Sequence, residues 1–229
     1  MRRFLHLILW LGLILSLSAC AVSAPAAPPP LYVALGASDS VGIGAPDPAR
    51  DGWVPQLQQR LPPGARLVNL GVSGARIADA VQQQLPVAAE QRPDLVTIWL
   101  AVNDFNARVP LDRYERDLDR LLTAVQATQP RRILIGNIPA LEQLPVYGVT
   151  GVTDMSRPQV QAEVARWNEV IARQAVRHGA TLVDLHSGWT ELASHPEYIS
   201  GDGFHPSAAG YQRLADVFYA ALEASGGID

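Results

Sequence analysis

Leu31-Tyr32-Val33-Ala34-Leu35-Gly36 is a continuous apolar run that ends just before Ser38. A short run of this kind, with no alternating polar residues, is typical of a strand that is buried on both faces of a parallel sheet. Ser38 would then project from the carboxyl end of that strand, where open α/β sheets bind their ligands. The run therefore predicts a buried strand and draws attention to the serine that follows it.

Four more apolar runs follow along the chain, and amphipathic stretches separate them. The runs cover 66–70, 95–100, 133–138 and 181–185, and the helical candidates cover 51–61, 76–90, 111–128, 157–178 and 206–224. Five strand–helix alternations predict a three-layer α/β/α domain with a five-stranded parallel sheet. Right-handed crossovers favour the flavodoxin-like strand order.

The amino terminus has the pattern of an export signal. Arg2 and Arg3 precede a short apolar run, and Leu17-Ser18-Ala19-Cys20 looks like a bacterial lipobox. We therefore expect a lipoprotein signal peptide over 1–19 and lipidation of Cys20. Cleavage by the ordinary signal peptidase and retention as a membrane anchor stay open as alternatives. Cys20 is the only cysteine, so the chain cannot form an internal disulfide.

Residues 20–30 are rich in proline and alanine and carry no charge, which predicts a semi-extended tether. The folded domain would then occupy 31–229. The chain has no lysine, and without Arg2 and Arg3 it holds 16 arginines against 22 acidic residues, a net charge of −6. An acidic domain without a basic patch argues against nucleic acid as a partner. We expect an exported protein, held by its lipid on the periplasmic or extracellular face of a bacterial membrane.

Three side chains could form a hydrolytic triad. A serine hydroxyl is a poor nucleophile until an oriented base removes its proton. In Asp202-Gly-Phe-His205-Pro206, Asp202 could accept a hydrogen bond from Nδ1–H of His205, which leaves Nε2 to face Ser38. The plainer alternative is that Asp202 caps a turn and His205 is a solvated loop residue.

Acyl transfer also needs donors for an oxyanion, and the ends of the first three predicted strands offer them. The candidates are the backbone N–H groups of Ser38 and Gly71 and the side-chain amide of Asn103. The chain shows no metal-ligand spacing, and it lacks the glycine patterns of phosphate and dinucleotide sites. We expect neither a metal nor a cofactor.

Four segments resemble, in order, the blocks of the SGNH (GDSL-type) hydrolases, in particular the bacterial esterases, thioesterases and lysophospholipases. The segments are Ala34–Gly42, Asn69–Gly71, Val102–Asp104 and Asp202–Pro206. The resemblance implies an SGNH fold, Ser38 as nucleophile, Asp202 and His205 as its partners, and Gly71 and Asn103 in the oxyanion hole. Ala37 and Ala101 depart from the family pattern, which has Asp and Gly there. A shifted alignment would make Ser40 the nucleophile. The α/β-hydrolase elbow Gly-x-Ser-x-Gly is absent.

The segment 139–156 is long for a simple connection, and we expect it to cover the site as a substrate-binding lid, with a plain surface loop as the alternative. Its apolar residues Leu144, Val146 and Tyr147 are candidate substrate contacts. We therefore expect an esterase that acts on acyl esters or thioesters, with lysophospholipids among the candidate substrates. The alternatives are a carbohydrate O-acetyl esterase, transfer to an acceptor other than water, and an inactive lipoprotein that only binds.

Overall fold

The described part of the chain builds one parallel sheet, in a computed structural model that covers residues 28–149, 153–188 and 190–228. Its strands are β1 (Leu31–Gly36), β2 (Arg66–Asn69), β3 (Leu95–Trp99), β4 (Arg132–Gly136) and β5 (Thr181–Val183). They lie in the order β2-β1-β3-β4-β5, and every neighbouring pair is parallel. The predicted sheet and its flavodoxin-like order are confirmed.

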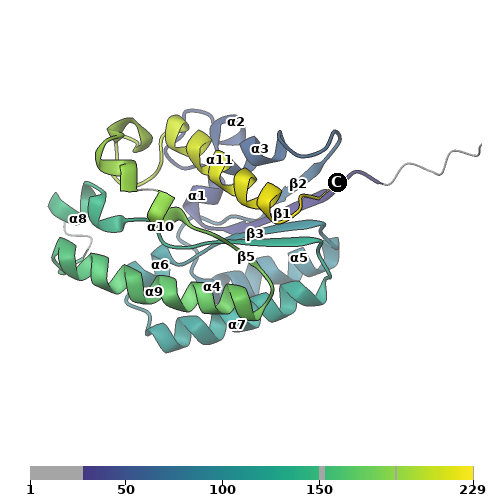
Figure 1. Ribbon diagram of the computed structural model, residues 1–229, viewed down its shortest axis with the longest axis horizontal. Coiled ribbons are helices and arrows are strands. Elements are labelled where there is room, and N and C mark those ends of the chain that lie inside the picture. The colour runs from purple at the N-terminus through teal and green to yellow at the C-terminus, as the bar shows by residue number, and fades with distance from the viewer. Residues whose placement is uncertain (1–27, 150–152, 189, 229) are drawn as a thin grey trace, which may run out of the picture.

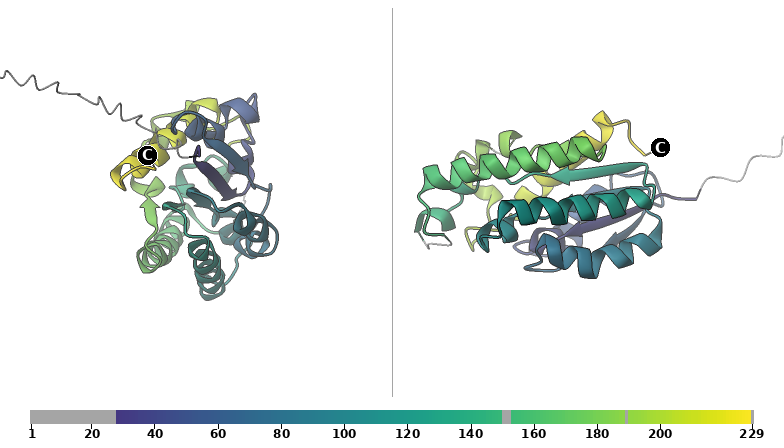
Figure 2. Two further views of the ribbon diagram at one scale, coloured as in Figure 1. Left: turned by 90° about the vertical axis from the view of Figure 1, so that its right-hand side faces the viewer. Right: turned by 90° about the horizontal axis from the view of Figure 1, so that it is seen from below.

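Helices cover both faces of the sheet (Figures 1 and 2). One face carries α1 (Ser38–Val41), α2 (Pro48–Asp51), α3 (Trp53–Gln58) and α11 (Ala208–Ala224). The other carries α4 (Ile77–Asp79), the π-helical turn η1 (Ala80–Gln84), α5 (Leu85–Gln91), α7 (Leu111–Ala127) and α9 (Arg157–Arg177). The shorter elements are α6 (Val102–Asn106), η2 (Leu141–Gln143), α8 (Val146–Val149), α10 (Leu185–Gly188), η3 (Thr190–Ala193) and η4 (Pro196–Tyr198).

Two of the helices differ from the sequence prediction. The helix expected over 51–61 is divided, because Gly52 takes an extended conformation (φ −68°, ψ 152°) between α2 and α3. The helix expected over 76–90 contains the π-helical turn η1, in which the wider backbone ring changes the direction of the side chains that follow. The predicted segment 139–156 holds η2 and α8 rather than plain loop.

Aromatic side chains fill the core on each side of the sheet. Between the sheet and the α3–α11 layer, Trp53 stacks on Phe218 with 4.2 Å between ring centroids. On the opposite face, Trp167 of α9 packs against Tyr114 of α7 at 4.7 Å. Five side chains on one face of α7 are buried: Tyr114, Leu118, Leu121, Leu122 and Val125. The burial of these apolar side chains is the main contribution to the stability of the fold.

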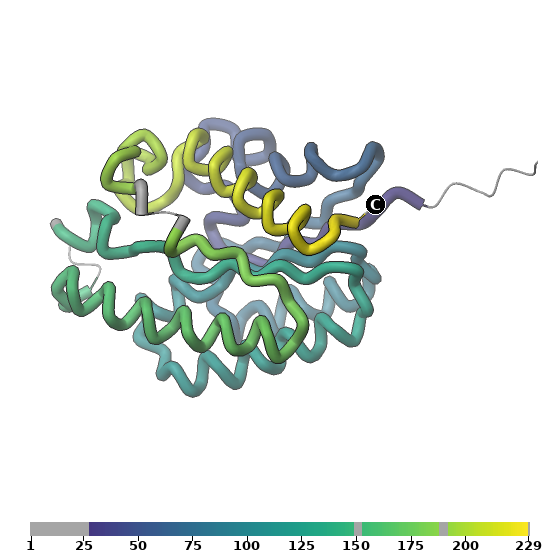
Figure 3. The backbone as a smooth tube through the Cα atoms, viewed as in Figure 1, coloured from purple at the N-terminus to yellow at the C-terminus, as the bar shows by residue number. Residues whose placement is uncertain are grey.

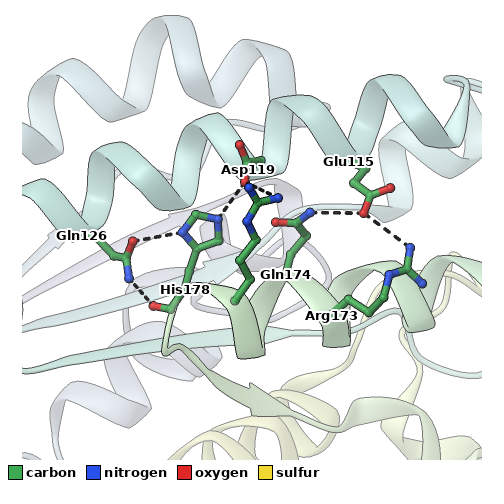
Figure 4. A network of polar contacts seen from close by, with 7 residues as sticks. Glu115, Asp119, Gln126, Arg173, Gln174 and His178 are labelled. Atoms are coloured by element: carbon green, nitrogen blue, oxygen red, sulfur yellow. Dashed lines mark hydrogen bonds and ion pairs between the residues drawn. The ribbon is translucent and has the colours of Figure 1, made fainter.

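A polar network joins the outer helices α7 and α9 (Figure 4). His178, which ends α9 as expected, is buried, and its Nδ1 and Nε2 lie 3.0 Å from Gln126 Oε1 and 2.9 Å from Asp119 Oδ1. Gln126 also donates to the His178 carbonyl oxygen. Both ring nitrogens of His178 are thus engaged, and this histidine serves helix packing.

The segments that follow the strands meet at the carboxyl edge of the sheet, as parallel strands require. The chain enters β1 at the opposite edge, close to the end of α11 (Figure 3). Within the described residues, no helix is long and apolar enough to cross a membrane. The signal peptide, Cys20 and the first part of the tether lie outside those residues, so these predictions stay predictions.

Candidate active site

The structure brings Ser38, His205 and Asp202 together at the carboxyl edge of the sheet. Ser38 Oγ lies 3.0 Å from Nε2 of His205, and Nδ1 of His205 lies 2.6 Å from Oδ2 of Asp202. The serine is 5% exposed, and the histidine side chain is 17% exposed. These contacts have the order and the distances that a nucleophile, its base and an orienting carboxylate need.

Asp202 is held in place by its other oxygen. Oδ1 accepts hydrogen bonds from the backbone N–H of Phe204 and His205 and from the hydroxyl of Ser200, at 2.8–2.9 Å. Partial burial acts to raise the pKa of Asp202, but the hydrogen bonds from His205, Phe204 and Ser200 outweigh it and lower that pKa to about 2. The carboxylate is therefore ionised at neutral pH and fixes Nδ1 as the protonated nitrogen.

Ser40, the alternative nucleophile, is buried beside β1. Its side chain is 1% exposed, and its hydroxyl has no hydrogen-bond partner among the described residues. It lies so close to Gly36 that a Cβ on that glycine would stand 1.9 Å from Ser40 Oγ. The geometry therefore favours Ser38 over Ser40 as the residue that faces the histidine.

Gln84 anchors the strand end that carries Ser38. Its buried side chain accepts from the N–H of Gly36 at 3.0 Å and donates to the carbonyl oxygen of Gly36 at 2.9 Å. It comes from the π-helical turn η1, a feature that often marks functional sites. Sequence reasoning missed Gln84, because a glutamine in an amphipathic stretch normally indicates a solvent-facing position.

The prediction for Gly71 needs correction. Its N–H donates to Oδ1 of Asn69 at 3.0 Å and so is not free to receive an oxyanion. A Cβ at Gly71 would stand 2.9 Å from Cβ of Ser40 and 3.1 Å from the carbonyl oxygen of Ala37. This glycine is therefore needed for the close approach of two loops.

Gly74, three residues further along the same loop, has the free donor. Its φ is +80°, which favours glycine, and a Cβ there would meet nothing within 4 Å. Its N–H makes no hydrogen bond to another described residue. The amide of Asn103 donates to the carbonyl oxygen of the adjacent Ala75 at 3.0 Å, which brings the two candidate donors together. The turn glycine in Ser73-Gly74 was the available sequence signal.

Asp104 fixes the end of the loop that carries Gly74 and Ala75. It is 1% exposed, and its Oδ2 accepts from the N–H of Ile77 at 2.9 Å. Burial raises the pKa of Asp104 to about 6, against the opposing hydrogen bond from Ile77. Asp104 therefore has a structural role, and Asn103 and Asp104 together tie the 74–77 loop to α6.

Two neighbouring pockets lie beside Ser38 and Asp39, and they share four lining residues. The smaller has a volume of about 280 Å³ including its open mouth, and its lining consists of Ala37, Ser38, Asp39, Trp99, Leu100, Ala101, Val102, Asn103 and Phe204. The larger, of about 410 Å³ including its open mouth, is almost wholly apolar. Its lining consists of Asp39, Trp99, Val102, Pro139, Leu141, Leu144, Leu192, Ile199, Phe204, Pro206 and Leu214.

The predicted substrate contacts divide between this pocket and the core. Leu144 lines the larger pocket, as expected for a residue that meets substrate. Val146 and Tyr147 do not line either pocket: they are 8% and 5% exposed, and the Tyr147 hydroxyl donates to Oδ1 of Asn106 at 2.6 Å. The structure places both residues in the core rather than at a pocket, because an apolar residue in a connecting segment can face the core as readily as a ligand.

The described residues contain no cluster of three or more His, Cys, Asp and Glu side chains that could hold a metal ion. What the site does contain is a nucleophile with its base, an ionised orienting group, two neighbouring amide donors and an apolar pocket. Together these groups can carry acyl transfer.

Comparison with known proteins points the same way. Residues 34–213 match the family described as GDSL-like lipase/acylhydrolase. An acetylxylan esterase of Geobacillus stearothermophilus is 26% identical over 167 residues, covering 68% of this chain and 71% of that protein. A lipase of Streptomyces rimosus is 26% identical over 236 residues, covering 86% of this chain and 88% of that protein.

Solved structures share the fold. The crystal structure of TesA superposes with a TM-score of 0.68 at 24% identity, covering 85% of this chain and 99% of that one. The acetylxylan esterase Axe2 of Geobacillus stearothermophilus superposes with a TM-score of 0.65 at 22% identity, covering 86% and 94%. At this level of identity the likeness concerns the fold alone.

Proposed function

The chain belongs to the GDSL-like lipase/acylhydrolase family and is an ester-hydrolysing enzyme, and from this premise we propose that Ser38, His205 and Asp202 are its catalytic triad. The observation that carries the proposal is the unbroken chain of contacts from Ser38 Oγ through His205 to Asp202, at 3.0 and 2.6 Å. A binding protein with a decayed site would have no need to keep all three groups in register.

The reaction would proceed in two halves. Ser38 Oγ attacks the ester carbonyl while Nε2 of His205 takes its proton, and the tetrahedral intermediate collapses when His205 returns that proton to the leaving alcohol. A water molecule then attacks the acyl-serine with His205 again as base, and the carboxylic acid leaves. Asp202 stays ionised throughout and stabilises the imidazolium that forms twice in each cycle.

The oxyanion would be held by three donors near Ser38. We assign these to the backbone N–H groups of Ser38 and Gly74 and to the second amide hydrogen of Asn103, the first being engaged by Ala75. Gly74 replaces Gly71 in this assignment because the Gly71 N–H is committed to Asn69 and the Gly74 N–H is not committed to any described residue. Removing one such donor typically lowers kcat by about 100- to 1000-fold.

The apolar pocket supports an acyl ester or thioester, with lysophospholipid as one possible form, as the substrate class. Ten of the residues that line it are apolar, and an apolar wall favours a hydrocarbon chain over a sugar. A carbohydrate O-acetyl ester is the second candidate, because the acetylxylan esterase of Geobacillus stearothermophilus is among the relatives. A series of 4-nitrophenyl esters from acetate to decanoate decides: activity confined to acetate supports the second candidate.

Export and lipid anchoring at Cys20 are part of the proposal. The chain enters the domain at the amino end of β1, whereas Ser38 follows its carboxyl end. A tether attached there would leave the entrance to the site unobstructed. Metabolic labelling with a fatty-acid analogue tests it, since labelling that survives Cys20→Ala would contradict the anchor.

The first experiment compares Ser38→Ala with Ser40→Ala in the full chain, purified in detergent. Ser40→Ala is a matched control, because it removes a neighbouring buried hydroxyl that has no partner among the described residues. We expect Ser38→Ala to lower 4-nitrophenyl butyrate hydrolysis by at least about 1000-fold and Ser40→Ala to keep most of it. The reverse result would overturn the assignment of the nucleophile.

A further inference from the structure

Asp39 directly follows Ser38 on α1 and lines both pockets. It is the one charged residue in the lining of the larger pocket, whose other ten residues are apolar. Trp99, Val102 and Phe204 also line both pockets, so Asp39 stands where the two spaces join. A substrate group that extends from Ser38 toward the apolar pocket therefore comes close to Asp39.

The carboxyl group is poorly compensated. No ion pair within the described residues involves Asp39. Burial raises its pKa to about 6, although His205 opposes this shift by charge attraction, and Asp202 adds to it. Placing a carboxylate in an apolar wall without a cation is costly for the fold, and so the position needs a reason outside packing.

Asp39 cannot orient the histidine. Nδ1 of His205 is already bound to Asp202 at 2.6 Å, and Nε2 faces Ser38 at 3.0 Å, so both ring nitrogens are engaged. The triad described above therefore gives Asp39 no task. What remains is its position on the path that a substrate group must take.

We propose that Asp39 is a specificity-determining residue, which makes the apolar pocket exclude esters whose pocket-bound group is anionic and admit neutral and cationic ones. This inference rests on the proposed function, because it presupposes that esters are the substrates. The physical basis is the Coulomb interaction across a poorly hydrated pocket: at about 6 Å and an effective dielectric constant of about 20, two unit charges change an affinity by about 100-fold. Screening by salt lowers this change in affinity to about tenfold at the mouth of the pocket.

The test measures kcat/KM at pH 8 for wild type, Asp39→Asn and Asp39→Glu. Three 4-nitrophenyl esters of similar acyl length are used: butyrate, the monoester of succinate and 4-(trimethylammonio)butyrate. A second series places the charge on the leaving group, with butyrylthiocholine and S-butyrylthioglycolate against a neutral thioester. Two series are needed because either the acyl or the alcohol part can occupy the pocket.

In one of the two series, we expect Asp39→Asn to raise kcat/KM for the anionic ester about tenfold relative to the neutral one and to lower it for the cationic ester. Asp39→Glu should keep the discrimination of wild type, because it keeps the charge. The comparison uses ratios between esters, because Asp39 also interacts by charge with His205 and its replacement changes the rate for neutral butyrate as well. At pH 5 the acid is largely protonated, so wild type should discriminate as weakly as Asp39→Asn.

The outcomes separate this inference from the function on which it rests. If wild type does not hydrolyse any neutral ester, the proposed function fails. If it hydrolyses butyrate but both series keep the same charge ratios in wild type and Asp39→Asn, the proposed role of Asp39 is wrong while the triad stands. The comparison of wild type at pH 5 and pH 8 tests the same charge effect without any variant when it uses the trimethylammonium esters, whose charge does not change with pH.

Discussion

Replacing Asp202 with asparagine separates orientation of the histidine from the folding of its loop. Oδ1 of Asp202 receives three donors, from Ser200, Phe204 and His205, and Oδ2 receives Nδ1 of His205. An asparagine can keep the three loop bonds if its oxygen takes the Oδ1 position. Its NH₂ group must then face Nδ1, which can only accept from it.

Asp202→Asn therefore favours the wrong tautomer of His205. With Nδ1 as acceptor, the proton of neutral His205 moves to Nε2, which can no longer take a proton from Ser38. We expect Asp202→Asn to lower kcat by about 10⁴-fold, which corresponds to about 5.4 kcal/mol in the activation free energy. Steady-state hydrolysis of 4-nitrophenyl butyrate measures this loss.

Asp202→Ala is the control, because it removes the loop bonds as well. Both variants should lose activity, but the amides of Phe204 and His205 should exchange faster with deuterium only in Asp202→Ala. An Asp202→Asn enzyme that keeps more than about a tenth of wild-type kcat would refute the reasoning, since orientation by a charged acceptor would then be dispensable.

Two further predictions concern the frame of the site. Gly36→Ala would push a methyl group against the side chain of Ser40. We expect this variant to lower the free energy of unfolding by about 1–3 kcal/mol in chemical denaturation and to reduce activity. The double variant Gly36→Ala/Ser40→Gly should recover part of both losses. Burial raises the pKa of Asp104 from 3.8 to about 6, so the folded state binds this proton more tightly than the unfolded state does. The resulting contribution to the free energy of unfolding is present in full below pH 4 and is lost as the pH rises through 6. This contribution is at most about 3 kcal/mol. Asp104→Asn should remove that loss, and a difference between the two unfolding free energies that stays constant from pH 4 to pH 7 would contradict it.

The parts of the site that sequence predicted are those fixed by local chemistry. Ser38 follows a plainly apolar buried strand, and the Asp202-to-His205 spacing lets one loop bring a carboxylate to an imidazole. Continuous apolar runs likewise predicted the strands, because burial on both faces leaves no polar positions, and the amphipathic pattern of 111–128 predicted α7, because a helix that is buried on one face keeps its period.

The parts that were missed depend on contacts between distant segments. The contact that occupies the Gly71 N–H is local, from Asn69 two residues before it, but the position of the 71–75 loop beside Ser38 also depends on the distant Asn103, which donates to the carbonyl oxygen of Ala75. Val146 and Tyr147 could not be told from pocket residues, since both environments select apolar side chains. The anchor formed by Gln84 on Gly36 needs a π-helical turn that propensities do not predict.

The most direct test of the catalytic assignment is covalent labelling with a fluorophosphonate, followed by peptide mapping by mass spectrometry. We expect one adduct per folded chain, on Ser38, formed at a rate that falls by orders of magnitude in His205→Ala and Asp202→Asn. An adduct on Ser40, or a folded enzyme that hydrolyses esters while Ser38 stays unmodified, would contradict the assignment.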